Sequence, residues 1–244
     1  FRANSAPTSS VAASVAPPST VPDTTALPTA VPTVPAAGVY RYVTTGEESV
    51  DILGGASHTY PAETTLTVVH TDCGALLTWT VLAERSDEWG ICATPEGIVW
   101  QGDGMAVWHH QFFSQDERTP TYYPDDVLLI PAAYVDDPMA GVWAPVQIAC
   151  TSDDRAWPAT FELLGTEDRT VDGVAVEAVH VRLTIEWDGG DLYEHSVVDY
   201  WFDRSGLPLS MASTKQTRND SGVIGAVDYV ETYRADLVSL TPLT

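Results

Sequence analysis

The chain has 244 residues, of which 34 are acidic and 11 basic, giving a formal net charge of −23 at pH 7. Such a charge repels nucleic acid and anionic lipid headgroups, so neither is expected as a direct partner. The length suits one large β domain or two small ones, and no apolar run is long enough to predict a membrane span.

Residues 1–37 are rich in Ala, Pro, Ser, Thr and Val and carry only two charged side chains, Arg2 and Asp23. This composition cannot bury a core and predicts a disordered, extended linker. Linkers of this kind commonly tether an outer domain. We therefore expect an extracytoplasmic domain (in the cell envelope or secreted) that reaches a membrane only through an anchor preceding Phe1. A plain disordered terminus without an anchor is the alternative.

Short β-type segments separated by Gly, Pro and Asp turns follow from Gly38 onward, with no sustained helical period. They predict a single all-β domain over residues 38–244, an antiparallel meander forming a curved sheet or an incomplete β-barrel. Residues 47–55 are expected as a loop or a short helical turn, and residues 120–141 as a long crossing loop. The expected strands are 39–43, 64–71, 75–83, 89–94, 98–101, 105–113, 127–130, 142–151, 156–165, three strands within 174–213, and a strand or strand pair in 224–240.

The stretch from Val174 to Ser213 organises the domain. Apolar residues alternate with polar ones from Val179 to Trp187, the period of a half-buried strand. If Gly189-Gly190 is a two-residue hairpin turn, Val179 faces Tyr200 across the hairpin. A second turn at 203–206 starts the next strand.

One face of this meander is the predicted ligand-binding surface. It consists of Val179, Val181, Tyr200, Phe202 and Met211, provided that the second turn keeps the strands in phase. A three-residue turn with a bulge would instead flip Met211 to the other face. If the face is incompletely covered, an apolar groove is left for a hydrophobic small molecule or a lipid.

Three cysteines, Cys73, Cys92 and Cys150, lack the spacing of a zinc or redox site. A turn centred on residues 85 and 86 puts Cys92 opposite Trp79 and Cys73 about 20 Å away. A disulfide needs Cα atoms within about 7 Å, so Cys92–Cys150 is predicted by elimination.

Catalytic and metal motifs are lacking in the sequence, so we expect a non-enzymatic protein with no cofactor and no metal. Acidic doublets at 125–126, 136–137 and 153–154 are interpreted as ordinary acidic loops rather than calcium ligands. In the predicted hairpin His180 lies opposite Asp199, either as a structural cross-strand pair, which we favour, or as a pH-sensing contact.

The segment Tyr200-Trp201-Phe202-Asp203-Arg204-Ser205-Gly206-Leu207-Pro208-Leu209 resembles the strand-turn-strand of LolA-like lipoprotein carriers and related envelope lipoproteins, and the start at 171–174 is similar. The resemblance covers about 45 residues. It implies an incomplete β-barrel around an apolar concavity that binds lipid or lipoprotein. The chain departs from that group by lacking the amphipathic helices that plug the concavity and a lipobox cysteine.

The sequence thus predicts a non-enzymatic envelope domain that binds a hydrophobic or lipid ligand, contacts an envelope protein, or acts as a sensor. Two alternatives stay open. Eight tryptophans would suit a carbohydrate-binding module if several rings were exposed and coplanar, although we expect most of them in the core. Carboxylates from the acidic loops would suit a hydrolase if two of them converged in a cleft.

Overall fold

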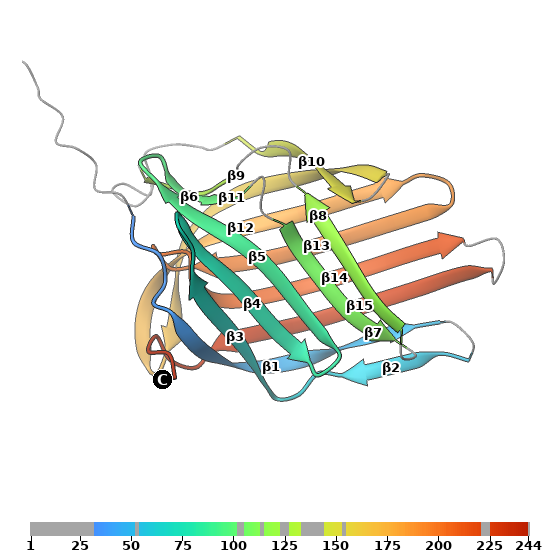
Figure 1. The fold of residues 1–244 in the computed structure, drawn as a ribbon, viewed down its shortest axis with the longest axis horizontal. Helices are drawn as coiled ribbons and strands as arrows, with labels where there is room; N and C mark the ends of the chain where they lie inside the picture. The colour runs from blue at the N-terminus through green and yellow to red at the C-terminus, as the bar shows by residue number, and fades with distance from the viewer. Residues whose placement is uncertain are drawn as a thin grey trace, which may run out of the picture.

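A computed structural model describes residues 32–51, 54–101, 105–112, 115–122, 127–132, 144–152, 155–220 and 225–243. The elements defined there are strands of one antiparallel sheet, which curls into a half-barrel (Figure 1). The strands are β1 (Gly38–Val50), β2 (Ala56–Thr59), β3 (Glu63–His70), β4 (Gly74–Leu82), β5 (Arg85–Thr94), β6 (Gly97–Trp100), β7 (Met105–Phe112), β8 (Gln115–Tyr122), β9 (Val127–Pro131), β10 (Val146–Ser152), β11 (Arg155–Val171), β12 (Val174–Asp188), β13 (Leu192–Phe202), β14 (Pro208–Asp220) and β15 (Ala226–Leu237). The predicted all-β antiparallel fold is confirmed.

The sheet is built from sequence neighbours and from one long-range join. Strands β11 to β15 pair in chain order, and β15 then pairs with β1, so the first and last long strands of the domain lie side by side. On the other side, β5 pairs with both β4 and β7. The path between β8 and β10 rests on a single residue pair within the described chain, Tyr122 with Thr151. Through this pair the sheet continues from β10 to β8.

The central meander has the predicted faces but a different register. Val179 pairs with Phe202 and Val181 with Tyr200, two residues away from the predicted partners. The connection is a four-residue loop, closed by a bond from the Gly189 amide to the Leu192 carbonyl, so the two-residue Gly-Gly turn is wrong. A shift of two residues keeps every side chain on its face, because side chains alternate with period two.

The strands that flank the second turn are in phase, as predicted, although the turn itself is the three-residue alternative, with Asp203 opposite Leu207 and Gly206 at φ 86°. Tyr200 pairs with Met211, and an irregularity between Trp201 and Phe202 absorbs the extra length of the turn. The Asp203 carboxylate accepts hydrogen bonds from the Ser205 and Leu207 amides at 2.8 and 3.0 Å, which fixes the turn. Met211 is consequently fully buried.

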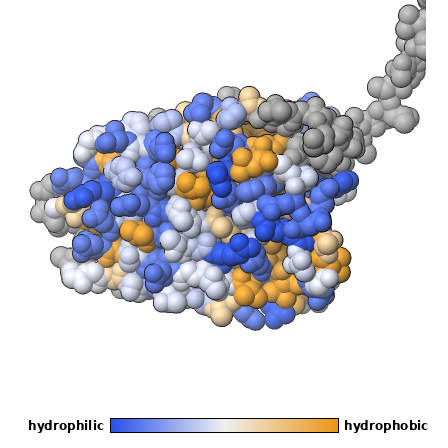
Figure 2. Space-filling view, turned by 180° about the vertical axis from the view of Figure 1, so that it is seen from behind, coloured by the Kyte–Doolittle hydropathy of each residue, from blue (hydrophilic) through white to orange (hydrophobic). Residues whose placement is uncertain are grey.

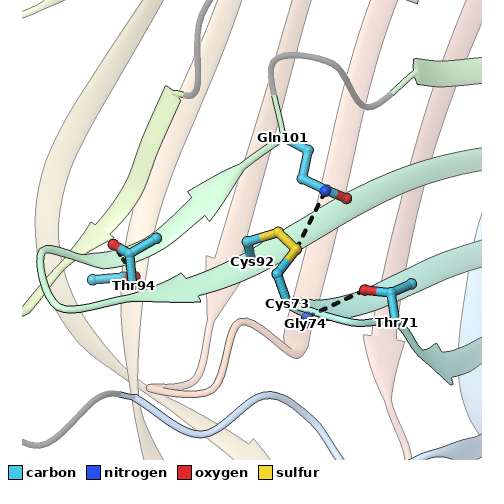
Figure 3. The surroundings of a disulfide bond; sticks show 7 residues. Thr71, Cys73, Gly74, Cys92, Thr94 and Gln101 are labelled. Atoms are coloured by element: carbon cyan, nitrogen blue, oxygen red, sulfur yellow. Dashed lines mark hydrogen bonds between the residues drawn. A yellow bond between two sulfur atoms is a disulfide. The ribbon is translucent and has the colours of Figure 1, made fainter.

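The predicted Cys92–Cys150 disulfide is wrong: Cys73 and Cys92 are bonded, with their Cα atoms 5.0 Å apart (Figure 3). The reason is the register of the β4–β5 hairpin, in which Cys92 lies opposite Gly74 rather than Trp79. The turn comes before Arg85, so that Arg85 starts β5 instead of occupying the turn. The side chain of Cys150 lies outside the described residues.

Two expectations for the N-terminal part also change. The first strand continues to Val50, through half of the expected loop, because it pairs with β15 along its length. Contacts with the domain begin before Gly38: Val34 packs on the core, and the Pro35 carbonyl accepts a hydrogen bond from His70 at 2.9 Å. The last residues of the expected linker thus belong to the folded part.

Candidate functional site

The interior of the half-barrel changes from apolar to charged along its axis. Inward positions of β14 run from Leu209 and Met211 through Ser213 to Lys215, and neighbouring strands follow the same order. On β15 the order is Leu237, Ala235, Tyr233 and Glu231, and on β13 it is Phe202, Tyr200, Val198, Ser196 and Glu194. Because these strands are in register, the charged positions meet at one end of the interior.

The charged end is held by Arg85, whose side chain is 4% exposed. Its guanidinium donates to Glu48 at 3.0 Å, to Glu231, and to Asp87 through two nitrogens at 3.0 and 3.2 Å. Two tyrosines and a histidine complete what we call the Arg85 cluster: Arg85, Glu48, Asp87, Glu231, Tyr60, Tyr229 and His58. A single guanidinium thus serves three carboxylates, two of which are almost fully buried.

The carboxylates of this cluster have different environments. Burial alone would raise the pKa of Glu231, but the charge and hydrogen bond of Arg85 outweigh it and hold this pKa below its usual value. Burial raises the pKa of Asp87 above its usual value, and Arg85 offsets only part of that effect. Of these two carboxylates, Asp87 is therefore the one whose charged form is disfavoured by burial more than its ion pair favours it.

A pocket of about 180 Å³ lies where the apolar and charged parts of the interior meet. Its apolar walls come from the central meander and from β4 to β6, while its polar side includes Arg85 and Asp87 from the Arg85 cluster. The lining residues are Trp79, Arg85, Asp87, Glu88, Trp89, Trp100, Leu183, Ile185, Glu194, Ser196, Val198, Tyr200, Met211, Ser213, Lys215, Glu231 and Tyr233.

Three aromatic rings form one wall of the pocket. The ring of Tyr200 lies 6.3 Å from that of Trp89 and 5.9 Å from that of Trp100, the second pair being edge to face. Such packing holds the rings rigidly and leaves them as an apolar wall for a ligand. The indole nitrogen of Trp89 is buried and has no hydrogen-bond acceptor among the described residues.

The five predicted ligand-binding residues are all buried on one face, as expected, but only part of them reaches the pocket. Tyr200 and Met211 line it. Val179, Val181 and Phe202 pack in the core beyond it, at the apolar end of the interior. There Gly206 of the 203–206 turn approaches Ile91 and Ile98 of the β5–β6 hairpin, so the motif that resembles the lipoprotein carriers helps to fill that end.

The predicted pair of His180 and Asp199 is formed, but diagonally and on the outer face. His180 Nε2 lies 2.8 Å from Asp199, and Arg182, which is directly opposite Asp199, binds it through two nitrogens at 2.9 and 3.0 Å. His180 itself faces Trp201 and stacks on its ring at 4.4 Å. Because Asp199 is shared with an arginine, the arrangement favours the structural interpretation.

The tryptophans whose side chains the structure describes lie mostly in the core. Trp79, Trp89, Trp100 and Trp201 are each at most 7% exposed, and Trp187 is half-buried. The face opposite to that in Figure 1 is mainly hydrophilic, with scattered hydrophobic patches (Figure 2). The side chains of Trp108, Trp143 and Trp157 and the three acidic doublets lie outside the described residues.

The described part of the chain lacks two features that would have pointed to a function. It contains no group of three or more His, Cys, Asp or Glu side chains placed to hold a metal ion. It also contains no helix long and apolar enough to cross a membrane.

Arg85 is the site residue that sequence reasoning missed. The segment Glu84-Arg85-Ser86-Asp87 has the composition of an exposed turn, and the acids that hold Arg85 inside are 37 and 146 positions away in the chain. Trp89 and Trp100 were predicted only as two of eight tryptophans on or next to strands, expected mostly in the core. The alternation Arg85, Asp87, Trp89, Ile91 on one face of a strand was the available signal.

Searches with this chain against protein-family models, curated proteins and solved structures found no match. The resemblance to LolA-like carriers therefore stays a prediction, and the case for a function depends on the pocket.

Proposed function

We propose that this protein is a non-enzymatic, extracytoplasmic binding domain of the cell envelope that takes a small apolar or amphipathic ligand into the pocket. The observation that carries the proposal is the pocket itself, in which apolar walls from β6, β12, β13 and β14 meet charged groups inside one half-barrel. The disulfide between Cys73 and Cys92 is compatible with an extracytoplasmic location, since such bonds persist in oxidising compartments.

The size of the pocket limits the ligand. At about 180 Å³ it is close to a cavity of about 150 Å³ that admits benzene, and smaller than typical drug-sized sites of about 300 Å³ or more. It suits a short alkyl chain or one ring rather than a complete diacyl lipid. Burying six carbons at about 0.8 kcal/mol each gives a binding free energy of about 5 kcal/mol. This value corresponds to a dissociation constant of a few tenths of a millimolar, on the order of 0.2 mM.

A hydrolase is the less favoured function, although three carboxylates do converge. Glu48, Asp87 and Glu231 each accept a hydrogen bond from the Arg85 guanidinium. Such an arrangement supports a structural ion cluster more than a pair of carboxylates flanking a substrate. A carbohydrate platform finds no support either, because four of the five described tryptophans are buried.

The test is binding of 1-hexanol to the full chain, measured by isothermal titration calorimetry and by saturation-transfer NMR. We expect saturable binding with a submillimolar dissociation constant. Val198 lines the pocket, whereas its neighbour Val197 lies on the outer face. Val198→Phe should therefore weaken binding at least tenfold, and the matched control Val197→Phe should leave it unchanged. Absence of saturable binding to the unmodified chain, or an equal effect of both substitutions, would contradict the proposal.

A further inference from the structure

The charges around the pocket are unbalanced, and this imbalance bears on the chemistry of the ligand. The lining contains four carboxylates, Asp87, Glu88, Glu194 and Glu231, against two basic side chains, Arg85 and Lys215. Both basic groups are already committed to acids of the protein. Arg85 is shared by three carboxylates of the Arg85 cluster, and Lys215 Nζ lies 3.3 Å from Glu194. A ligand entering the pocket therefore meets a formal excess of negative charge.

Because these charges are partly buried, they should influence a ligand in the pocket more than the acidic groups of the outer surface do. The side chains of Glu194, Asp87 and Lys215 are 12%, 22% and 35% exposed, so salt screens them less than the outward-facing charges. Asp87 has only Arg85 as its close cationic partner in the described cluster, and Arg85 also serves Glu48 and Glu231. A cation placed beside Asp87 would be stabilised, while a carboxylate in the same position would be repelled.

The aromatic wall is suited to the same kind of ligand. Trp89, Trp100 and Tyr200 line the pocket together with Asp87 and Glu194. The faces of tryptophan and tyrosine rings attract cations, and this attraction grows when the cation is removed from water, as it would be inside the pocket. The aromatic wall and the carboxylates should therefore both favour a positively charged ligand.

We propose that the ligand is a small organic cation, an alkyl- or arylammonium whose charged group lies beside Asp87 and Glu194 and whose apolar part packs on Trp89, Trp100 and Tyr200. This inference rests on the proposed function, since it specifies the ligand of the same pocket. It also distinguishes this domain from a carrier of fatty acids, whose carboxylate would face the excess of acidic groups.

The experiment compares three ligands with the same six-carbon chain, namely hexylammonium, 1-hexanol and hexanoate, by calorimetry on the full chain at pH 7. We expect hexylammonium to bind about tenfold more tightly than 1-hexanol, and hexanoate to bind least, in 25 mM salt. If hexanol binds as tightly as hexylammonium, or hexanoate binds best, the inference fails while the proposed function stands. If none of the three binds, both fail.

Two substitutions of opposite sign locate the effect in the pocket. Lys215→Gln removes a positive charge from the lining and should raise hexylammonium affinity by about threefold to tenfold while weakening hexanoate. Glu194→Gln should lower hexylammonium affinity by a similar factor. Arg218→Gln is the matched control. Arg218 lies on the same strand as Lys215 with its side chain 60% exposed, and its substitution changes the net charge by the same amount as Lys215→Gln. Equal effects of Lys215→Gln and Arg218→Gln would overturn the inference, since they would show only the influence of total charge.

Discussion

Replacement of Arg85 by methionine is the most informative perturbation, because one guanidinium binds three carboxylates inside the half-barrel. Methionine replaces the apolar stem of the side chain and removes the guanidinium group with its charge and its donors. Hydrogen bonds to charged groups contribute about 1.5–3 kcal/mol each, and Arg85 makes such bonds to two almost fully buried acids, Glu48 and Glu231. Removal of one partner from a buried ion pair costs about 3–5 kcal/mol, so the free energy of unfolding at pH 7.5 should fall by that amount.

The pH dependence supplies a sharper expectation. In the unmodified protein Arg85 keeps the pKa of Glu231 low, so the stability from this group is complete above the usual pKa of a glutamate and is lost only as the pH falls through the depressed value. Without the guanidinium, burial raises the pKa of Glu231 and raises that of Asp87 further. The variant is then destabilised most at neutral pH and regains stability as the pH falls. The difference in unfolding free energy between the two proteins should therefore narrow from pH 7.5 to pH 5.

Urea unfolding followed by tryptophan fluorescence, at pH 7.5 and at pH 5, measures this difference. Arg218→Met, at an exposed position of β14, is the control and should change stability by no more than about 0.5 kcal/mol. Two results would refute the idea that Arg85 stabilises the buried carboxylates of the Arg85 cluster. One is a loss of unfolding free energy below about 1 kcal/mol for Arg85→Met, and the other is a loss that is the same at both pH values.

Three other outcomes are expected. Peptide mapping without reduction should yield a linked peptide containing Cys73 and Cys92, and Cys73→Ser should lower the unfolding free energy by about 3 kcal/mol, because the bond closes a loop between residues 19 positions apart. Asp199→Asn should cost about 1 kcal/mol at pH 7, and this cost should disappear as the pH falls through the depressed pKa of Asp199, because its bonds to Arg182 and His180 favour its charged form. Limited proteolysis of the chain should stop on the N-terminal side of Val34, which packs on the core, and a stable fragment starting at Gly38 would show those contacts to be unimportant.

The architecture and the faces of the central strands could be predicted from the sequence because both depend on alternation. The prediction that Val181, Tyr200 and Met211 share a buried face survived an error of two residues in the hairpin register, since an even shift leaves each side chain where it was. The exact pairing depended on the conformation of the Gly189-Gly190 loop. The composition of that loop allows both a two-residue and a four-residue connection.

The disulfide and the candidate site could not be predicted for a common reason. The prediction placed Arg85 in the turn, which shifted the β4–β5 register by five residues and separated Cys73 from Cys92. In the actual register the two cysteines are bonded. Arg85 lies inside the half-barrel because it forms ion pairs with Glu48 and Glu231. The local sequence does not identify these partners, since they are far away in the chain. The pocket could not be predicted for the same reason, because Arg85 forms part of its charged side.

The pairing of β1 with β15 also determines how the domain can be linked to other molecules. Val39 forms a bridge with Leu243, so the start of β1 and the last described residues lie side by side (Figure 1), next to the core residues Tyr40 and Leu237. The Arg85 cluster begins at Glu48, eight residues further along β1, which is about 26 Å away. A surface linker or a fused partner attached next to residue 243 would therefore leave the charged end unobstructed.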